Sequence, residues 1–169
     1  MGAIILLSGP VGAGKSTVAR ELVPQLPPPV SYIDGDTFWS FFAQPVKGSP
    51  RERFPVIVRS MIAASVPFAR SGFDVVLDFS IPPHFLETAR KIVKEIELHY
   101  VVLLPSEAVC AQRAAARAEG AIADYGPYRE FYSMFSGVER YAVSDGGGAP
   151  EVAAARIREG LKAGNFRVP

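Results

Sequence analysis

The segment 9–16, which reads GPVGAGKS, constrains the fold of this chain more than any other feature. It follows the short apolar run 3–8 and satisfies the pattern G-x-x-x-x-G-K-S, in which glycines let backbone N–H groups converge on phosphate oxygens. The pattern carries weight only between a strand and a helix, and both are expected here, at 3–8 and 15–22. We therefore predict a buried first strand followed by a phosphate-binding loop, called the phosphate loop below. The alternative is a glycine-rich turn with a chance lysine.

Apolar runs and amphipathic stretches alternate along the rest of the chain. Further strands are expected at 31–34, 74–79, 98–104 and 140–144, and helices at 37–42, 51–70, 85–96, 107–118, 128–135 and 151–161. Strands that alternate with helices form parallel sheets covered on both faces, so we predict a three-layer α/β sandwich around a five-stranded parallel sheet. A chain of 169 residues has room for one core, and residues 1–169 are therefore interpreted as a single domain.

The composition argues against several classes of partner. Hydrophobic residues make up 49% and charged residues 21% of the chain, and the net charge of +1 indicates neither long nucleic acid nor a membrane surface as a partner. The apolar run 3–8 is too short for a signal core or a membrane span. The only cysteine, Cys110, excludes an internal disulfide and suits a reducing compartment, so we expect a cytoplasmic protein. A monomer and a homodimer are both compatible with the sequence.

The residue types of the phosphate loop indicate that it binds ATP together with Mg²⁺. Lys15 would carry its charge to the β- and γ-phosphates, and the Ser16 hydroxyl would ligate the metal. The positive end of the following helix would add to the attraction for phosphate. The residues expected to bind the nucleotide are Gly9, Pro10, Val11, Gly12, Ala13, Gly14, Lys15, Ser16 and Thr17.

Acidic residues follow two of the other expected strands, at the sheet edge where ligands bind in open α/β folds. Asp34 and Asp36 face the same way if the second strand runs through both, and either could contact the substrate. We expect Asp36 to orient an acceptor hydroxyl and accept its proton. Asp78, at the end of the third strand, would order Mg²⁺, its water or the substrate. The alternatives are that Asp36 caps the next helix and that Asp78 pairs with a local backbone N–H.

Two pairs of arginines are further candidates. Arg113 and Arg117 lie four residues apart and would share one helix face, where they could stack on adenine or neutralise the transferred phosphoryl group. The irregular stretch 118–128 beside them is placed where a mobile lid could exclude water. Arg51 and Arg53 are expected on the substrate side, where one could bind an anionic acceptor. For both pairs the alternative is a solvated helix surface.

With these motifs, the chain resembles the small P-loop kinases of the nucleoside-monophosphate-kinase fold, especially gluconate and shikimate kinases, and it is also similar to chloramphenicol phosphotransferase. The phosphate loop, YIDGD at 32–36, VVLD at 75–78 and the helix with Arg113 and Arg117 carry the resemblance, which covers nearly the whole chain. It implies the strand order 2-3-1-4-5. Two places depart from the pattern. Residues 37–39 (TFW) replace the His-Pro type signature of gluconate kinases, and 79–83 (FSIPP) replace a glycine-rich stretch of shikimate kinases. The glycines at 146–148 look like the base-side loop.

The sequence thus predicts an ATP-dependent kinase that transfers the γ-phosphoryl group to the hydroxyl of a small molecule such as a sugar acid. The alternatives are an antibiotic phosphotransferase with a chloramphenicol-like acceptor, a nucleoside or nucleotide kinase, and an ATP-binding switch without an acceptor. A guanine-nucleotide switch is disfavoured because it would carry an Asn-Lys-x-Asp element, and the only asparagine of this chain is Asn165.

Overall fold

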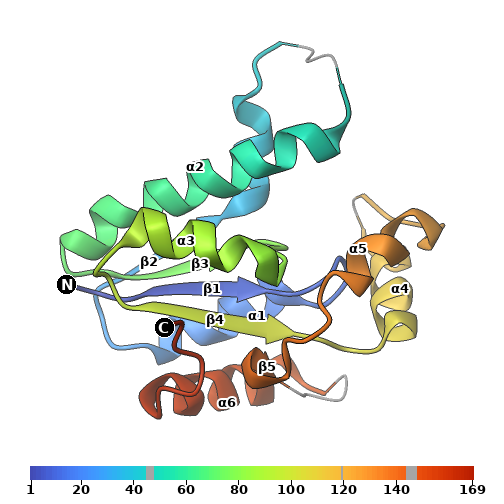
Figure 1. The fold of residues 1–169 in the computed structure, drawn as a ribbon. Helices are drawn as coiled ribbons and strands as arrows, with labels where there is room; N and C mark the ends of the chain where they lie inside the picture. Colours follow the sequence, from blue (N-terminus) through green and yellow to red (C-terminus); the bar gives the residue numbers. More distant parts are fainter. Residues whose placement is uncertain (45–47, 119, 144–147) are drawn as a thin grey trace.

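The computed structural model describes residues 1–44, 48–118, 120–143 and 148–169. A five-stranded sheet lies between two layers of helices (Figure 1). The strand order is β2-β3-β1-β4-β5, and each neighbouring pair is parallel. The predicted fold class and strand order are therefore confirmed.

The sheet is built around β1, which has a neighbour on each side. The strands are β1 (Ile4–Ser8), β2 (Val30–Asp34), β3 (Asp74–Asp78), β4 (Leu98–Leu103) and β5 (Ala142–Val143). Every residue of β1 is buried, as its unbroken apolar sequence requires of a central parallel strand. Ile4 and Leu6 pack into the core on one face, and Ile5 and Leu7 into the core on the other, because side chains alternate along a strand.

Helices cover both faces of the sheet. They are α1 (Lys15–Leu22), α2 (Pro50–Arg70), α3 (Leu86–Val93), α4 (Glu107–Ala115), α5 (Arg129–Ser133) and α6 (Pro150–Lys162). Short 3-10 helices lie at Val23–Gln25, Gly35–Phe41, Pro83–Phe85, Gly126–Tyr128 and Glu139–Tyr141. In Figure 1, α2 and α3 lie on one side of the sheet and α1 and α6 on the other. Among the described residues, no helix is both long and apolar enough to cross a membrane.

The last strand begins at Ala142 instead of 140, because residues 139–141 form a 3-10 helix, and its predicted last residue, 144, lies outside the described residues. The strand β5 pairs only with Val102 and Leu103. The beginning of β4 pairs instead with the C-terminal residues: Tyr100 N–H donates to the Phe166 carbonyl at 2.9 Å, and Val168 N–H donates to the Leu98 carbonyl at 2.8 Å. The direction is antiparallel. The sheet edge is thus shared between two segments, and residues 139–141 form a 3-10 turn before the short strand.

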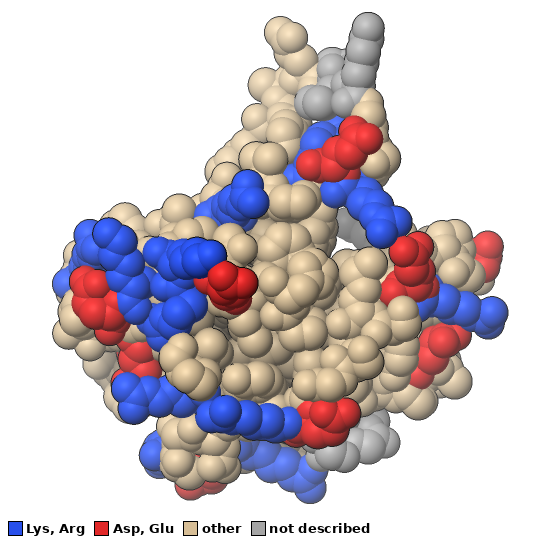
Figure 2. Space-filling model, in the orientation of Figure 1, with Lys and Arg blue, Asp and Glu red and all other residues tan. Residues whose placement is uncertain are grey.

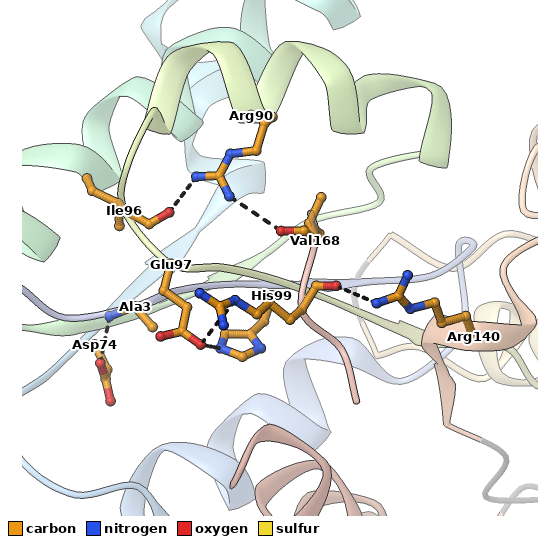
Figure 3. A network of polar contacts seen from close by, with 9 residues as sticks. Ala3, Asp74, Arg90, Ile96, Glu97, His99, Arg140 and Val168 are labelled. Carbon is orange, nitrogen blue, oxygen red and sulfur yellow. Dashed lines mark hydrogen bonds and ion pairs between the residues drawn. The ribbon is translucent and has the colours of Figure 1, made fainter. Parts of the chain in front are cut away.

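Polar contacts hold the C-terminal segment in place at the end of the sheet opposite the phosphate loop (Figure 3). The Arg90 guanidinium donates to the carbonyl oxygens of Ile96, at 2.5 Å, and Val168, at 3.4 Å. Arg140 donates to the Arg167 carbonyl at 3.2 Å. His99 Nε2 lies 3.2 Å from a carboxylate oxygen of Glu97. Most of these contacts are accepted by backbone carbonyls, so they fix the path of the C-terminal segment. The cavity described below lies at the other end of the sheet.

Candidate active site

A cavity of about 1380 Å³ opens at the carboxyl ends of the central strands. Figure 2 shows the surface hollowed between the start of α2 and the lobe that carries α4 and α5, with acidic and basic side chains interspersed over this face. Of the site residues expected from the sequence, its lining includes Val11, Gly12, Ala13, Gly14, Lys15, Ser16, Thr17, Asp36, Arg51, Asp78, Arg113 and Arg117. Gly9, Pro10, Asp34 and Arg53 lie outside the lining. Most of the predicted site residues thus come together in one cavity.

Glycines of the phosphate loop occupy conformations that other residues adopt at a cost. Gly12 has φ +82°, and a Cβ atom there would lie 2.1 Å from the Cys110 carbonyl oxygen, so the loop packs directly against the backbone of α4. Gly14 has φ +91° and precedes the first residue of α1. Left-handed backbone of this kind favours glycine. The loop can therefore pass tightly from β1 into α1, whose N-terminus faces the cavity.

Two side chains from outside the phosphate loop donate hydrogen bonds to its carbonyl oxygens. Tyr125 donates its hydroxyl hydrogen to the Val11 carbonyl oxygen at 2.7 Å, and Arg113 Nη1 donates to the Ala13 carbonyl oxygen at 3.2 Å. Because a trans peptide is planar, the N–H of the next residue points away from its carbonyl. The N–H groups of Gly12 and Gly14 are thereby turned away from these two donors. This is the backbone orientation that a phosphate-binding nest needs.

Asp78 is a buried carboxylate next to the phosphate loop, with 3% of its surface exposed. The Tyr32 hydroxyl donates to its Oδ2 at 3.1 Å, and the Ser16 hydroxyl donates to the same carboxylate. Burial raises the pKa of Asp78, while these hydrogen bonds and the positive charge of Lys15 act against the rise. A buried carboxylate such as Asp78 stays ionised only if a nearby cation compensates for the loss of hydration.

The ammonium group of Lys15 lies in the field of two carboxylates. Its Nζ donates to the Pro10 carbonyl oxygen at 3.2 Å. Burial lowers the pKa of Lys15, and the negative charges of Asp78 and Asp36 partly oppose this effect. An anionic phosphate placed beside the ammonium would add a further negative charge that favours its protonated form.

Ser16 and Asp78 together fit a Mg²⁺ ion. Both offer oxygen ligands, which this hard cation prefers, and the cation would relieve the burial of the Asp78 charge. Within the described residues no group of three or more His, Cys, Asp or Glu side chains could hold a metal. The remaining ligands would therefore have to come from nucleotide phosphates and water, as Mg²⁺ commonly binds.

Asp34 and Asp36 have different environments, and the expectation that Asp36 caps the next helix is wrong. The strand β2 ends at Asp34, whose Oδ1 accepts a 3.0 Å hydrogen bond from the Asp36 backbone N–H, so Asp34 is the cap of the 3-10 helix Gly35–Phe41. Because the strand does not run through both residues, their side chains do not share one strand face. Only Asp36 lines the cavity. The walls around Asp36 desolvate it and raise its pKa, against the opposing charge of Lys15.

Arg113 and Arg117 do not share a helix face, because α4 ends at Ala115 instead of continuing to 118. The chain turns back there, and the Ile122 N–H bonds to the Ala114 carbonyl at 3.0 Å. Arg117 lies beyond the helix but still lines the cavity. Its positive charge lowers the pKa of both Lys15 and Asp36. The two arginines therefore meet the cavity from different structural elements.

Arg51 and Arg53 also differ. Arg51 lines the cavity and pairs with Glu130 of α5 at 3.3 Å, between two exposed side chains. Arg53 places its guanidinium carbon 5.7 Å from the centre of the Phe42 ring. Of these two arginines, only Arg51 therefore lines the cavity.

The segment 118–128 forms a wall of the cavity through Ile122, Pro127 and Tyr128. Tyr125 is 7% exposed and anchors this segment to the phosphate loop. Residue 119 lies outside the described residues, as do 145–147 of the expected base-side loop. Gly148, which is described, lines the cavity. A lid movement of 118–128 stays a prediction.

Of the aromatic side chains of the site, sequence reasoning considers only Trp39 as a pocket wall, and its cluster with Phe38, Phe41 and Phe42 fits the core better. Trp39, Phe54, Phe79, Phe85 and Phe131 line the cavity. In the sequence, Phe54 and Phe85 fit the apolar stripe of their helices and were therefore expected in the core. The available signal was Phe79, which directly follows Asp78 at the ligand-binding edge of the sheet.

Comparison with known proteins agrees with this architecture. A family model described as an AAA domain matches residues 4–139. The structure of a tunicamycin resistance protein from Deinococcus radiodurans has a TM-score of 0.71 and 20% identity, with 100% of this chain and 99% of that chain covered. An APS kinase of Mycobacterium tuberculosis, solved with AMPPNP and APS, has a TM-score of 0.71 and 21% identity, covering 95% and 98%.

A gluconokinase from Sinorhizobium meliloti has a TM-score of 0.61 and 20% identity, and 96% of each chain is covered. At these identities the likeness establishes the fold, and it confirms the resemblance to small P-loop kinases that the sequence indicates. A search of curated proteins gives no significant match.

Proposed function

Because the chain belongs to the AAA domain family, whose model matches residues 4–139, we propose that it is an ATP-dependent phosphotransferase with an alcohol group of a small molecule as acceptor. One observation carries the proposal. Lys15, Asp36 and Asp78 line the same cavity as the phosphate loop, and both carboxylates act electrostatically on the Lys15 ammonium. A cation placed between a nucleotide site and a proton acceptor is what phosphoryl transfer requires.

The phosphate loop and Lys15 would bind the terminal phosphates of ATP. The oriented N–H groups of Gly12 and Gly14 and the start of α1 favour negative charge at this point. Ser16 and Asp78 would hold Mg²⁺, which supplies positive charge to the transferred phosphoryl group when it is bound. A phosphate beside Lys15 would also oppose the lowering of its pKa by burial.

The transfer itself would be an in-line displacement. The acceptor oxygen bonds to the γ-phosphorus while the bond from that phosphorus to the β–γ bridging oxygen breaks, and the bond electrons leave with ADP. Asp36 accepts the proton of the acceptor hydroxyl, for which its raised pKa suits it better than an ordinary aspartate. Arg117, whose charge acts on both Lys15 and Asp36, would stabilise charge that develops between them.

The test is MgATP binding by calorimetry, followed by a screen for acceptor-dependent ADP release. We expect Lys15→Ala to lower turnover by about 100-fold or more, as loss of a group that stabilises the transition state does. Lys91→Ala is the matched control, because Lys91 is an exposed residue of α3 that pairs with Glu87 outside the cavity. Equal turnover by the Lys15→Ala variant and the wild type would refute the proposal, as would absence of MgATP binding.

A further inference from the structure

Beyond the phosphate loop, aromatic rings bound the cavity. They belong to Trp39, Phe54, Phe79, Phe85 and Phe131, which we call the aromatic wall. Trp39 comes from the same 3-10 helix as Asp36, and the other rings come from α2, from the chain after β3, from the 3-10 helix Pro83–Phe85 and from α5. Segments far apart in the sequence thus bring one kind of side chain to the part of the cavity next to Asp36.

Phe54 is the centre of this wall. Its ring centroid lies 5.5 Å from that of Phe79, 5.7 Å from that of Phe85 and 5.8 Å from that of Phe131. Phe79 and Phe85 are buried and belong to the core, whereas Phe54 and Phe131 are partly exposed. The core therefore supports the rings from behind, so they are held in place before any ligand binds.

The chain behind Phe79 is also fixed by hydrogen bonds. The Ser8 hydroxyl donates to the Ile81 carbonyl oxygen at 2.8 Å and accepts from the Ile81 N–H at 2.8 Å. This reciprocal pair joins the segment after β3 to the end of β1, directly before the phosphate loop. The segment that carries Phe79 is thus joined to the strand that leads into the phosphate loop.

The described charges of the cavity do not favour an anionic acceptor at this wall. Arg51 of α2, which lines the cavity, is already paired with Glu130, and Arg53, which directly precedes Phe54, lies outside the lining with its guanidinium carbon 5.7 Å from the centre of the Phe42 ring. Arg113 donates to the phosphate loop, and the charge of Arg117 acts on Lys15 and Asp36, between which the proposed function places the transferred phosphoryl group. The faces of aromatic rings carry negative potential and repel anions.

We propose that the acceptor is an uncharged alcohol with an aromatic ring, which packs on the aromatic wall while its hydroxyl faces Asp36. This inference rests on the proposed function and narrows its acceptor class. A carboxylate substrate would lie between the Asp36 charge and ring faces that repel anions, so a sugar acid is the disfavoured class. The ring supplies apolar area for binding, and the hydroxyl supplies the reacting oxygen.

Trp39 provides a direct probe, because it is the only tryptophan of the chain and lies in the aromatic wall. The wild-type protein with MgATP is titrated with matched compounds: phenyl glucoside against glucose and gluconate, and uridine against ribose. Tryptophan fluorescence is excited at the red edge of its absorption, and ADP release is followed in parallel. We expect phenyl glucoside and uridine to change the fluorescence and to drive ADP release with a KM at least about tenfold below that of the compounds without a ring.

The outcomes separate this inference from the proposed function. Gluconate or glucose acting as well as phenyl glucoside would overturn the inference and leave the phosphotransferase in place. Failure of both ring compounds in a protein that binds MgATP by calorimetry would also overturn it. Absence of MgATP binding is a failure of the proposed function itself.

Variants of the wall test the same point from the protein side. Phe54→Leu keeps an apolar side chain and removes the ring, and we expect a three- to tenfold higher KM for the ring compounds with unchanged MgATP affinity, as roughly follows from a lost ring contact. Phe68→Leu is the control, because Phe68 lies on the same helix, is 45% exposed and packs on Phe73 outside the cavity. Phe131→Leu repeats the test from α5, in case the Phe54 variant unfolds.

A charge variant completes the test. Glu130→Gln removes the negative charge that is paired with Arg51, so the cavity lining becomes more positive by one charge. We expect this variant to bind gluconate better than the wild type does and to bind phenyl glucoside equally well. Identical KM values for ring compounds in the Phe54→Leu, Phe131→Leu and Phe68→Leu proteins would overturn the inference.

Discussion

The hydroxyl of Tyr125 donates a 2.7 Å hydrogen bond to the carbonyl oxygen of Val11, two residues that lie 114 positions apart in the sequence. The bond joins the segment 118–128 to the phosphate loop. Burial raises the pKa of Tyr125, so the phenol keeps its hydrogen at neutral pH and acts as a donor. Through the planar peptide, this bond fixes the direction of the Gly12 N–H. A residue outside the loop motif thus helps to set the orientation of the motif's backbone.

Tyr125→Phe is therefore expected to weaken ATP binding. The change removes one hydrogen bond, which contributes about 0.5–1.5 kcal/mol, so affinity should fall by roughly two- to tenfold. Calorimetry with MgATP measures the effect. Tyr132→Phe is the control, because the Tyr132 hydroxyl donates to the Pro105 carbonyl at 2.8 Å instead of to the loop. If the two variants bind MgATP equally well, Tyr125 has no special role in the loop.

Tyr32 is expected to influence the metal requirement through Asp78. Its hydroxyl donates to Asp78 Oδ2 at 3.1 Å and helps to lower the pKa of that carboxyl. In Tyr32→Phe the Asp78 carboxyl becomes easier to protonate, so more Mg²⁺ should be needed for the half-maximal rate, by roughly two- to tenfold if one hydrogen bond is lost. A magnesium titration of ADP release checks this.

The matched control for Tyr32 is Tyr141→Phe. The Tyr141 ring packs on Tyr100, 5.3 Å between centroids, and the residue lies outside the cavity lining. We expect its magnesium requirement to equal that of the wild type. A similar shift in both variants would show that the effect comes from general loosening and not from Asp78.

Substitutions at Asp34 and Asp36 should separate stability from catalysis. Asp34 caps the 3-10 helix Gly35–Phe41, so Asp34→Ala should lower the free energy of unfolding by about 0.5–2 kcal/mol, while Asp34→Asn, which also caps, should not. Asp36→Asn should lower kcat by roughly 100-fold or more, since it removes the proton acceptor, with little change in stability. Denaturant unfolding and steady-state kinetics measure the two effects. The reverse pattern would exchange the roles given to these residues.

The sequence predicts the sheet and the phosphate loop well because both depend on local patterns. Buried parallel strands are continuous apolar runs, and the loop is set by glycines, Lys15 and Ser16 at fixed spacing. The end of α4 was placed too late because alanines continue the helical pattern past Ala115, whereas the turn there is fixed by a hydrogen bond from Ile122.

Other features could not be read from local pattern, because they depend on contacts between distant segments. The pairing of Phe166 and Val168 with the first half of β4 is one of them, and nothing in the C-terminal sequence marks that pairing. The aromatic wall is similar: each phenylalanine alone fits a helix core or a strand end, and only the folded chain shows that the rings meet around Phe54. Arg51 and Arg53 are neighbours in α2, yet only Arg51 reaches the cavity.

The pH range in which the rate is maximal should be narrower than it would be with ordinary pKa values of Asp36 and Lys15. The limit moves inward at both the acid and the alkaline end. Asp36 must be unprotonated to accept a proton, so the rate falls when the pH drops through its pKa, and desolvation has raised that pKa above the usual 3.8. Lys15 acts as a cation, so the rate falls again when the pH rises through its pKa, which burial has lowered below the usual 10.5. Profiles of kcat/KM at saturating Mg²⁺ measure both limbs.

Lys15→Arg should move the alkaline limb to higher pH, because an arginine stays charged. If the residual activity of Asp36→Asn kept the wild-type acid limb, the group that titrates there would be a different one, with the buried Asp78 as the first alternative.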